Sequence, residues 1–260
     1  MTMPPDAILS ARDLRFDYGN GQGVRGVSFD LWPGDVLGIV GESGSGKTTL
    51  LKLLGGLLAP SGGSLSYRDA SGELLDLLAL PEARRRHLAR TELGFVHQNP
   101  RDGLRLAVTA GGNVGERLMA TGGRHYGRIR QSALDWLTRV EIDGARIDDR
   151  PTQFSGGMQQ RLQIARNLVS GPRLVLMDEP TGGLDVSVQA RLLDLLRSLV
   201  ADLGLSVVIV THDLGVARLL ADRLMVMQGG RVIEEGLTDQ VLDDPREPYT
   251  QLLVSSVLAA

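Results

Sequence analysis

Cysteine is absent from the 260 residues of this chain, and only two of its 28 basic residues are lysines. The lack of cysteine excludes disulfides and thiolate metal sites and is typical of a reducing compartment, so we expect a cytoplasmic protein. Apolar runs approaching the roughly 20 residues that cross a bilayer are missing, as is a basic N-terminal segment followed by an apolar stretch. The net charge of −3 provides no positive field that would attract nucleic acid, which we exclude as a partner.

A glycine-rich segment, GESGSGKT, carries one of the two lysines. It follows an apolar run, VLGIV, and precedes a leucine-rich stretch, an order that predicts a buried strand, a loop and a helix. Glycines allow the loop N–H groups to turn toward an anion, and the helix beginning near Lys47 adds its positive end. We therefore expect ATP here, with Lys47 between the β- and γ-phosphates and the Thr48 hydroxyl on Mg²⁺. The nucleotide-binding residues expected in the loop are Gly41, Glu42, Ser43, Gly44, Ser45, Gly46, Lys47, Thr48 and Thr49.

Acidic residues end a second buried apolar run, LVLMDEP, at the edge where parallel sheets hold their ligands. Asp178 is predicted to hold Mg²⁺ mostly through water, and Glu179 to act as the base that polarises the attacking water. His212, which follows the run SVVIV, is expected to reach the γ-phosphate. Gln98, which follows LGFVH, is expected to contact Mg²⁺ and the attacking water. The predicted catalytic residues are Glu179, His212 and Gln98, and the predicted metal ligands are Thr48, Gln98 and Asp178.

The segment FSGGMQQR predicts a second helix N-terminus suited to an anion. Ser155 is a good N-cap residue, and two glycines and a long helical pattern follow it. The chain would then have two phosphate sites but a single loop that carries the phosphate-binding lysine. The simplest solution is a two-fold homodimer, in which Ser155 and Gly157 of one copy close over the γ-phosphate held by Lys47 of the other.

The remaining patterns favour an α/β fold in one domain that spans residues 1–260. Short strands separated by Gly and Pro turns dominate near the start of the chain and predict an antiparallel sheet beside the phosphate loop. Helical patterns fill about 99–170, which predicts a helical subdomain inserted into a core of about 1–98 and 171–260. The segment LMVMQGGRVIEEG is expected to form a terminal hairpin.

Taken in order, these motifs resemble those of the ATP-binding-cassette (ABC) ATPases over nearly the whole chain. The resemblance implies a P-loop NTPase fold with a RecA-like core, an antiparallel β subdomain and an inserted α-helical subdomain. It also implies that Tyr18 stacks on adenine and that Gly182 to Asp185 form a loop that acts across the dimer. Two departures from the common motifs, Met158 and the segment TGGLD, also occur in active members of the family. The family resemblance adds Tyr18, Gly156 and Asp185 to the expected ATP site, beside Ser155 and Gly157 of the segment FSGGMQQR.

Within that family the chain resembles the ATP-binding subunit of the bacterial carbon-phosphorus lyase system, which breaks down phosphonates. One block that carries this similarity spans residues 102–127, and around its start Arg101, Asp102 and Arg105 make the surface charged. Importer ATPases usually have a Leu-Asn-Pro type segment at this place, which receives a membrane protein. The expected partners are therefore a second copy of the chain, soluble lyase core subunits and, as a further option, a second ABC subunit.

The alternative is the nucleotide-binding subunit of an importer for peptides, phosphonates or metals, with a membrane permease as its partner. The C-terminal segment DDPREPYTQLLVSSVL is shared with the ATPases of peptide and nickel importers, so it does not separate the two interpretations. A tandem ABC protein is excluded because the chain carries a single set of motifs and no linker.

Overall fold

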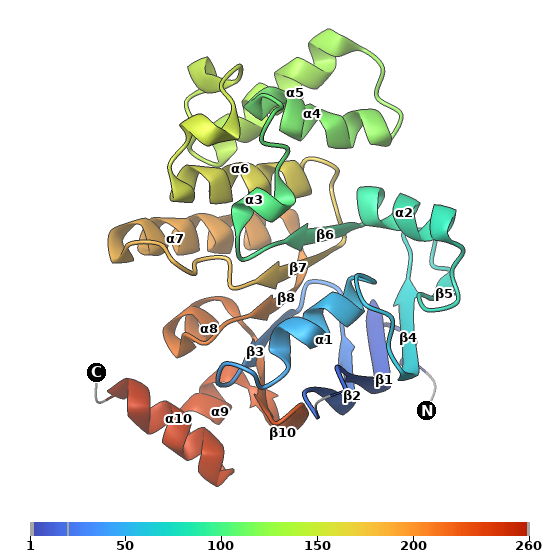
Figure 1. Ribbon diagram of the computed structural model, residues 1–260, viewed down its shortest axis with the longest axis vertical. Coiled ribbons are helices and arrows are strands. Elements are labelled where there is room, and N and C mark those ends of the chain that lie inside the picture. The colour runs from blue at the N-terminus through green and yellow to red at the C-terminus, as the bar shows by residue number, and fades with distance from the viewer. Residues whose placement is uncertain (1–2, 20, 259–260) are drawn as a thin grey trace.

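Two β-sheets organise the computed structural model, which describes residues 3–19 and 21–258 (Figure 1). The first is antiparallel and has the strand order β2-β1-β4-β5. Its strands are β1 (Leu9–Asp17), β2 (Gly23–Leu31), β4 (Gly62–Arg68) and β5 (Leu74–Asp76). They include the short strands expected from the Gly and Pro turns near the start of the chain.

The second sheet has the order β10-β9-β3-β8-β7-β6 and leads into the phosphate loop. Neighbouring strands from β9 to β6 run parallel, and β10 at the edge is antiparallel to β9. The strands are β3 (Val36–Val40), β6 (Leu93–Val96), β7 (Leu174–Asp178), β8 (Ser206–Val210), β9 (Arg223–Gln228) and β10 (Arg231–Leu237). Every residue of β3, β7 and β8 is buried, because helices cover both faces, and this explains apolar runs without alternation.

Helices on the two faces of the parallel sheet form two hydrophobic clusters. On one face, α1 (Lys47–Leu54) packs with Leu176 and Val208 of the sheet and with residues of the antiparallel sheet. On the other face, α6 (Gly156–Leu168) and α7 (Val186–Leu203) pack with Val175 and Ile209. Because successive strand residues point to opposite faces, the same short strands supply both clusters.

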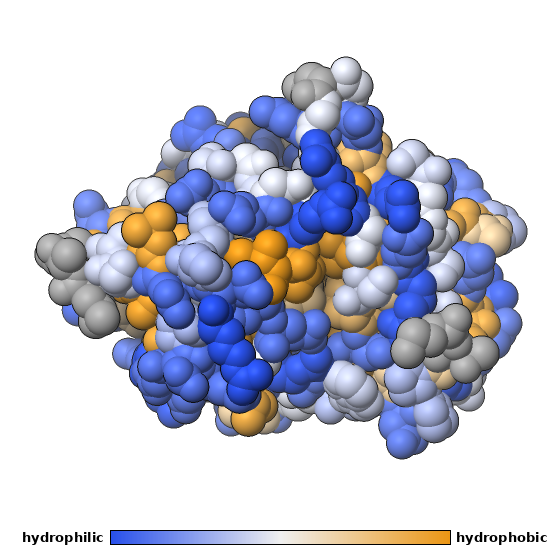
Figure 2. Space-filling model, turned by 90° about the horizontal axis from the view of Figure 1, so that it is seen from below, coloured by the Kyte–Doolittle hydropathy of each residue, from blue (hydrophilic) through white to orange (hydrophobic). Residues whose placement is uncertain are grey.

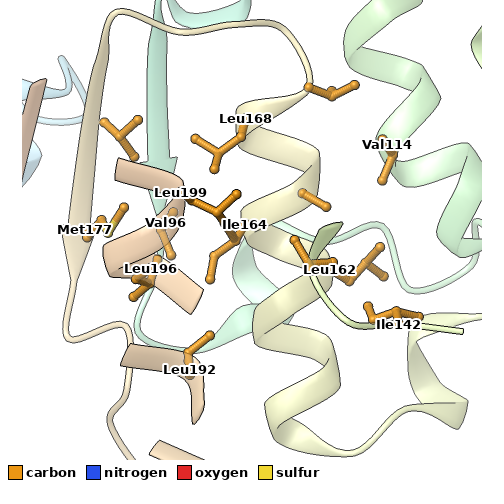
Figure 3. Close-up of a cluster of buried hydrophobic side chains, with 14 of the residues drawn as sticks. Val96, Val114, Ile142, Leu162, Ile164, Leu168, Met177, Leu192, Leu196 and Leu199 are labelled. Atoms are coloured by element: carbon orange, nitrogen blue, oxygen red, sulfur yellow. The ribbon is translucent and has the colours of Figure 1, made fainter. Parts of the chain in front are cut away.

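The segment between β6 and β7 is mostly helical, as the sequence predicts. It contains α3 (Pro100–Gly103), α4 (Ala110–Ala120), α5 (Tyr126–Arg139), α6 and two short 3-10 helices, η1 (Gly144–Arg146) and η2 (Pro151–Gln153). Figure 3 shows α6 packed on two sides, with Ile164 and Leu168 toward the sheet and α7, and Leu162 toward Ile142. The helical segment and the sheet thus share one hydrophobic cluster. The subdomain boundaries at about 99 and 170 remain a prediction.

Four further helices lie around the sheets in the described part of the chain, and one of them, α8 (Leu214–Leu220), packs beside β3. The basic run of α2 (Glu82–Thr91) forms a solvated face, on which Arg84 pairs with Glu73 and Arg86 with Glu82. The hairpin of β9 and β10 forms as expected, but it is not terminal: α9 (Thr238–Asp243) and α10 (Pro248–Leu258) follow it. These two helices were not predicted from the sequence.

The surface below the sheets is mixed in character. Viewed from below, hydrophilic residues surround a band of hydrophobic ones across the middle (Figure 2). Within residues 3–19 and 21–258, no helix combines the length and the apolar character that a membrane span requires.

Candidate active site

A cleft of about 510 Å³ opens where β3 enters the phosphate loop and where β6, β7 and β8 end. Its position at the carboxyl ends of parallel strands is typical of ligand sites in α/β proteins, and its volume suits a small molecule. The lining residues are Tyr18, Gln22, Gly23, Ser43, Gly44, Gly46, Lys47, Thr48, Thr49, Gln98, Glu179 and His212. The fold therefore brings the three predicted catalytic residues to the phosphate loop from three separate segments of the chain.

The phosphate loop between β3 and α1 requires glycine at two positions. A Cβ atom at Gly41 would lie 2.2 Å from the Met227 oxygen, and one at Gly46 would lie 2.5 Å from the Gly23 oxygen. Both glycines also have a positive φ, 146° and 102°, which other residues rarely adopt. These glycines let the loop lie directly against β9 and β2 while its other residues line the cleft.

The Lys47 ammonium is buried at the base of the loop, with 5% of the residue exposed. Its Nζ donates hydrogen bonds to the backbone oxygens of Gly41 and Glu42, each at 2.7 Å. Burial lowers the pKa of this ammonium, and nearby carboxylates, Glu179 first among them, oppose the shift. A desolvated cation held by carbonyl groups gains strongly from an anion, so Lys47 is suited to receive phosphate.

Two of the predicted metal ligands contact each other. The Thr48 hydroxyl donates to Asp178 Oδ1 at 2.8 Å. Burial raises the pKa of Asp178, and the hydrogen bond from Thr48 partly opposes this rise. Oxygen groups are the ligands that Mg²⁺ prefers, so this pair fits a site in which Thr48 would bind the ion and Asp178 would hold it mostly through water.

No cluster of three or more His, Cys, Asp or Glu side chains that could hold a metal occurs in the described part of the chain. A magnesium site at Thr48 and Asp178 would therefore depend on water and nucleotide phosphates for its other ligands, which is the usual arrangement for this ion.

The Glu179 carboxylate lies between the other two predicted catalytic side chains. Gln98 Nε2 donates to Glu179 Oε2 at 2.9 Å, and His212 Nδ1 lies 3.1 Å from Glu179 Oε1. These three residues follow β6, β7 and β8, which are neighbours in the sheet. A carboxylate held on both oxygens at the wall of the cleft can accept a proton from a water molecule that attacks a bound phosphate.

The backbone of Glu179 is itself unusual. Its φ is +41°, a left-handed conformation that a residue with a side chain seldom adopts. The Glu179 N–H nevertheless donates to the Val210 oxygen at 2.9 Å, which ties the residue to β8. Such strain is often found at functional sites, where the surrounding structure holds it in place.

Tyr18 lies at the edge of the cleft and is 54% exposed. Its ring packs edge-on against Phe16, with ring centroids 4.8 Å apart, and its hydroxyl lies 3.4 Å from Thr49 Oγ1. The ring is therefore oriented by two neighbours while much of it stays open to a planar ligand such as adenine.

The residues expected to act across a dimer do not line this cleft within residues 3–19 and 21–258; they are Ser155, Gly156, Gly157 and Asp185. Ser155 caps α6 and accepts a hydrogen bond from the Met158 N–H at 3.4 Å. Asp185 is exposed and precedes α7. Of the predicted loop set, Gly41, Glu42 and Ser45 also lie outside the lining, as does the predicted metal ligand Asp178.

A polar contact that the sequence analysis missed joins α6 to the residue before Gln98. The His97 N–H donates to Gln163 Oε1 at 2.6 Å, and Gln163 Nε2 donates back to the His97 oxygen at 3.0 Å. One turn later, Asn167 Oδ1 accepts from the Phe95 N–H at 3.1 Å. Two fully or nearly fully buried amides spaced four apart on α6 thus complete the hydrogen bonds of the edge strand β6. The sequence signal that could have predicted this contact is the presence of two polar amides, Gln163 and Asn167, within the helical run LQIARN.

Comparison with known proteins agrees with this geometry. The family model for the ABC transporter matches residues 24–182. The chain is 69% identical over 251 residues to a putative phosphonates utilization ATP-binding protein, PhnK, of Escherichia coli, covering 96% of this chain and 98% of that protein. It is 41% identical over 260 residues to the dipeptide transport ATP-binding protein DppF of Escherichia coli, covering 96% of this chain and 76% of that protein.

Among solved structures, the fold is similar to a dimeric, post-hydrolysis state of the ATP-binding cassette MJ0796 bound to ADP and Pi. The TM-score is 0.78 at 29% sequence identity, and the similarity covers 89% of this chain and 99% of that one. These findings confirm the expected fold class, a P-loop α/β fold of the cassette type. The chain belongs to the ABC transporter family, and it is an ABC ATPase.

Proposed function

We propose that this ATPase dimerises and couples ATP hydrolysis to a soluble carbon-phosphorus lyase core during phosphonate breakdown. The observation that carries the proposal is the 69% identity, over nearly the full length of both chains, to a protein named for phosphonates utilization. Identity to the dipeptide transport protein is much lower, at 41%.

In the proposed reaction, Lys47 and the phosphate loop hold the β- and γ-phosphates of ATP, and the Tyr18 ring stacks on adenine. Thr48, Asp178 and Gln98 would hold Mg²⁺, which neutralises charge on the phosphates when bound. Glu179 accepts a proton from the attacking water, and His212 orients this carboxylate and reaches the γ-phosphate. The related cassette bound to ADP and Pi supports this choice of substrate.

Dimerisation is supported by the separation of two predicted phosphate-binding elements. Ser155 at the start of α6 lies outside the cleft that contains Lys47. Among the described residues, the nearest atom that a Cβ at Gly156 would meet belongs to Leu184, at 3.8 Å, so packing within these residues does not require glycine at this exposed position. A second copy that packs closely against the start of α6 would require a residue without a side chain at Gly156. The similar cassette structure is dimeric.

The proposed partner surface is the charged segment after Gln98. Arg101 and Asp102 are exposed, and a groove of about 260 Å³ whose lining includes Asp102 lies beside them. Arg105 is less available than the sequence suggested, because its Nη1 lies 2.9 Å from Glu116 Oε1. Arg101 makes no ion pair within the described residues, so it offers the cleaner test.

The test is affinity purification of the tagged chain from cells that grow on a phosphonate as their phosphorus source. We expect soluble lyase subunits in the eluate, and we expect Arg101→Glu to lose them, because a repelled or unpaired charge at an interface costs about 2 to 5 kcal/mol. Arg197→Glu, an exposed arginine on α7, makes the same charge change as a control and should retain them.

A second candidate is the ATPase subunit of a peptide importer, which the 41% identity to the dipeptide transport protein favours. Integral membrane permeases in the eluate, without soluble lyase subunits, would support that candidate and overturn the lyase assignment.

A further inference from the structure

The C-terminal helix α10 reaches the phosphate loop through one hydroxyl group. The Glu42 N–H donates a hydrogen bond to the Tyr249 hydroxyl oxygen at 2.9 Å, across a sequence separation of 207 residues. Figure 1 shows α10 at the lower left, close to the loop that precedes α1. Tyr249 lies beyond the residues that the family model matches, 24–182.

This contact completes the hydrogen bonding of one peptide group. The carbonyl oxygen of the peptide bond between Gly41 and Glu42 accepts from Lys47 Nζ at 2.7 Å, and its N–H donates to Tyr249. The peptide plane is therefore held at both ends, on one side by the phosphate-binding ammonium and on the other by α10. Glu42 is not among the lining residues of the cleft, so the bond does not use an N–H group of the loop residues that line it.

The helix that carries Tyr249 is itself anchored to the core. Glu234 of β10 accepts hydrogen bonds from the N–H groups of Arg246 and Glu247, at 2.8 and 3.1 Å, just before α10 begins. Tyr249 and Leu253 pack against the hydrophobic cluster that contains Val40, the last residue of β3 before the loop. The hydroxyl therefore approaches the loop from a fixed position.

We propose that Tyr249 is a positioning residue that holds the phosphate loop in the conformation that binds ATP. This inference rests on the proposal that the cleft binds ATP. Without the hydroxyl, the peptide between Gly41 and Glu42 loses one of its two constraints, and the loop must be ordered when the nucleotide binds. One net hydrogen bond of this neutral kind corresponds to a change of about 2- to 10-fold in an equilibrium constant.

The test compares Tyr249→Phe, which keeps the ring in its packing, with a matched control on the same helix. Gln251→Ala removes the hydrogen bond from Gln251 Nε2 to the Pro245 oxygen and touches neither the loop nor the cleft. We expect Tyr249→Phe in the full chain to raise the KM for ATP by about 2- to 10-fold while kcat stays within about twofold. Hydrogen exchange at the Glu42 amide should become faster, whereas Gln251→Ala should change neither quantity.

An unchanged KM together with unchanged Glu42 exchange in Tyr249→Phe overturns the inference. A lower thermal midpoint with no change in KM assigns Tyr249 a purely structural role and also overturns it. Lys47→Ala separates this outcome from a failure of the ATP site itself. If Lys47→Ala loses ATP binding while Tyr249→Phe binds ATP normally, the cleft is the ATP site and the proposed role of Tyr249 is wrong. If Lys47→Ala binds ATP as the native chain does, the proposal that the cleft binds ATP is itself wrong.

Discussion

Replacing Glu179 by glutamine should separate ATP binding from ATP hydrolysis. Both carboxylate oxygens of Glu179 contact a neighbour, Gln98 at 2.9 Å and His212 at 3.1 Å. A glutamine has the same shape and keeps one acceptor oxygen, so the cleft and its phosphate-binding residues should remain in place. It cannot take a proton from water, and so it removes the proposed general base.

The expected cost in turnover is about 10²- to 10⁴-fold, the usual contribution of a positioned base, which corresponds to about 2.7 to 5.4 kcal/mol in the barrier. The expected cost in folding stability is smaller, about 1 kcal/mol, because a hydrogen bond to a charged acceptor becomes a neutral one. ATP affinity should be retained, because Lys47 and the loop glycines are untouched. The variant should therefore accumulate as an ATP-bound dimer.

The assay measures phosphate release with ATP and Mg²⁺, nucleotide affinity at equilibrium, and molecular size with and without ATP. Glu92→Gln is the matched control, because it makes the same substitution at a carboxylate that accepts hydrogen bonds but lies outside the lining of the cleft. Glu92 Oε2 accepts from the Tyr67 hydroxyl at 2.9 Å and from the Ala70 N–H at 3.0 Å. Turnover by Glu179→Gln within about threefold of the native rate, far below the loss expected for a base, would refute the assignment of Glu179. A variant that binds ATP yet stays monomeric at high concentration, with no partner able to restore the dimer, would refute the shared site.

Two further predictions concern buried polar side chains. Asp178→Asn should abolish Mg²⁺-dependent turnover and yet raise the thermal midpoint of the nucleotide-free protein at pH 7.5, because burial raises the pKa of this carboxyl and its ionised form opposes folding. A carboxyl group with a raised pKa contributes stability at low pH, and this stability is lost as pH rises through the pKa of the folded state. The gain in thermal midpoint from asparagine should therefore shrink as pH falls toward about 4, near the ordinary pKa of aspartate. A gain that stays constant in thermal unfolding scans at stepped pH would contradict this cause. Gln163→Met should lower kcat more than it changes the KM for ATP, because it removes the hydrogen bonds that hold the His97 backbone and so loosens Gln98, the next residue. Asn167→Leu, one turn away on α6, should lower the thermal midpoint with little effect on kcat. Equal kinetic effects of the two substitutions would show that α6 acts only through stability.

The sequence by itself determined those parts of the site that lie next to one another along the chain. The strand, loop and helix around Lys47 follow one another in the chain, so hydrophobic pattern and glycine spacing are enough to predict them. The fully buried strands β3, β7 and β8 appear as apolar runs for the same reason, and the acidic pair at the end of one of them marks the ligand-binding edge. Helix α9 escaped prediction because it has only six residues. Helix α10, with 11 residues, escaped prediction because it follows a hairpin that looked terminal.

Only the tertiary structure decided which side chains meet. The neighbouring positions of β6, β7 and β8 in the sheet place Gln98, Glu179 and His212 in contact, and no local pattern specifies that strand order. The contact between Glu42 and Tyr249 spans 207 residues, and a single hydroxyl leaves no periodic trace in the sequence. Local periodicity reports which face of an element is buried, whereas long-range contacts depend on how the buried faces pack together, and that packing is a property of the whole fold.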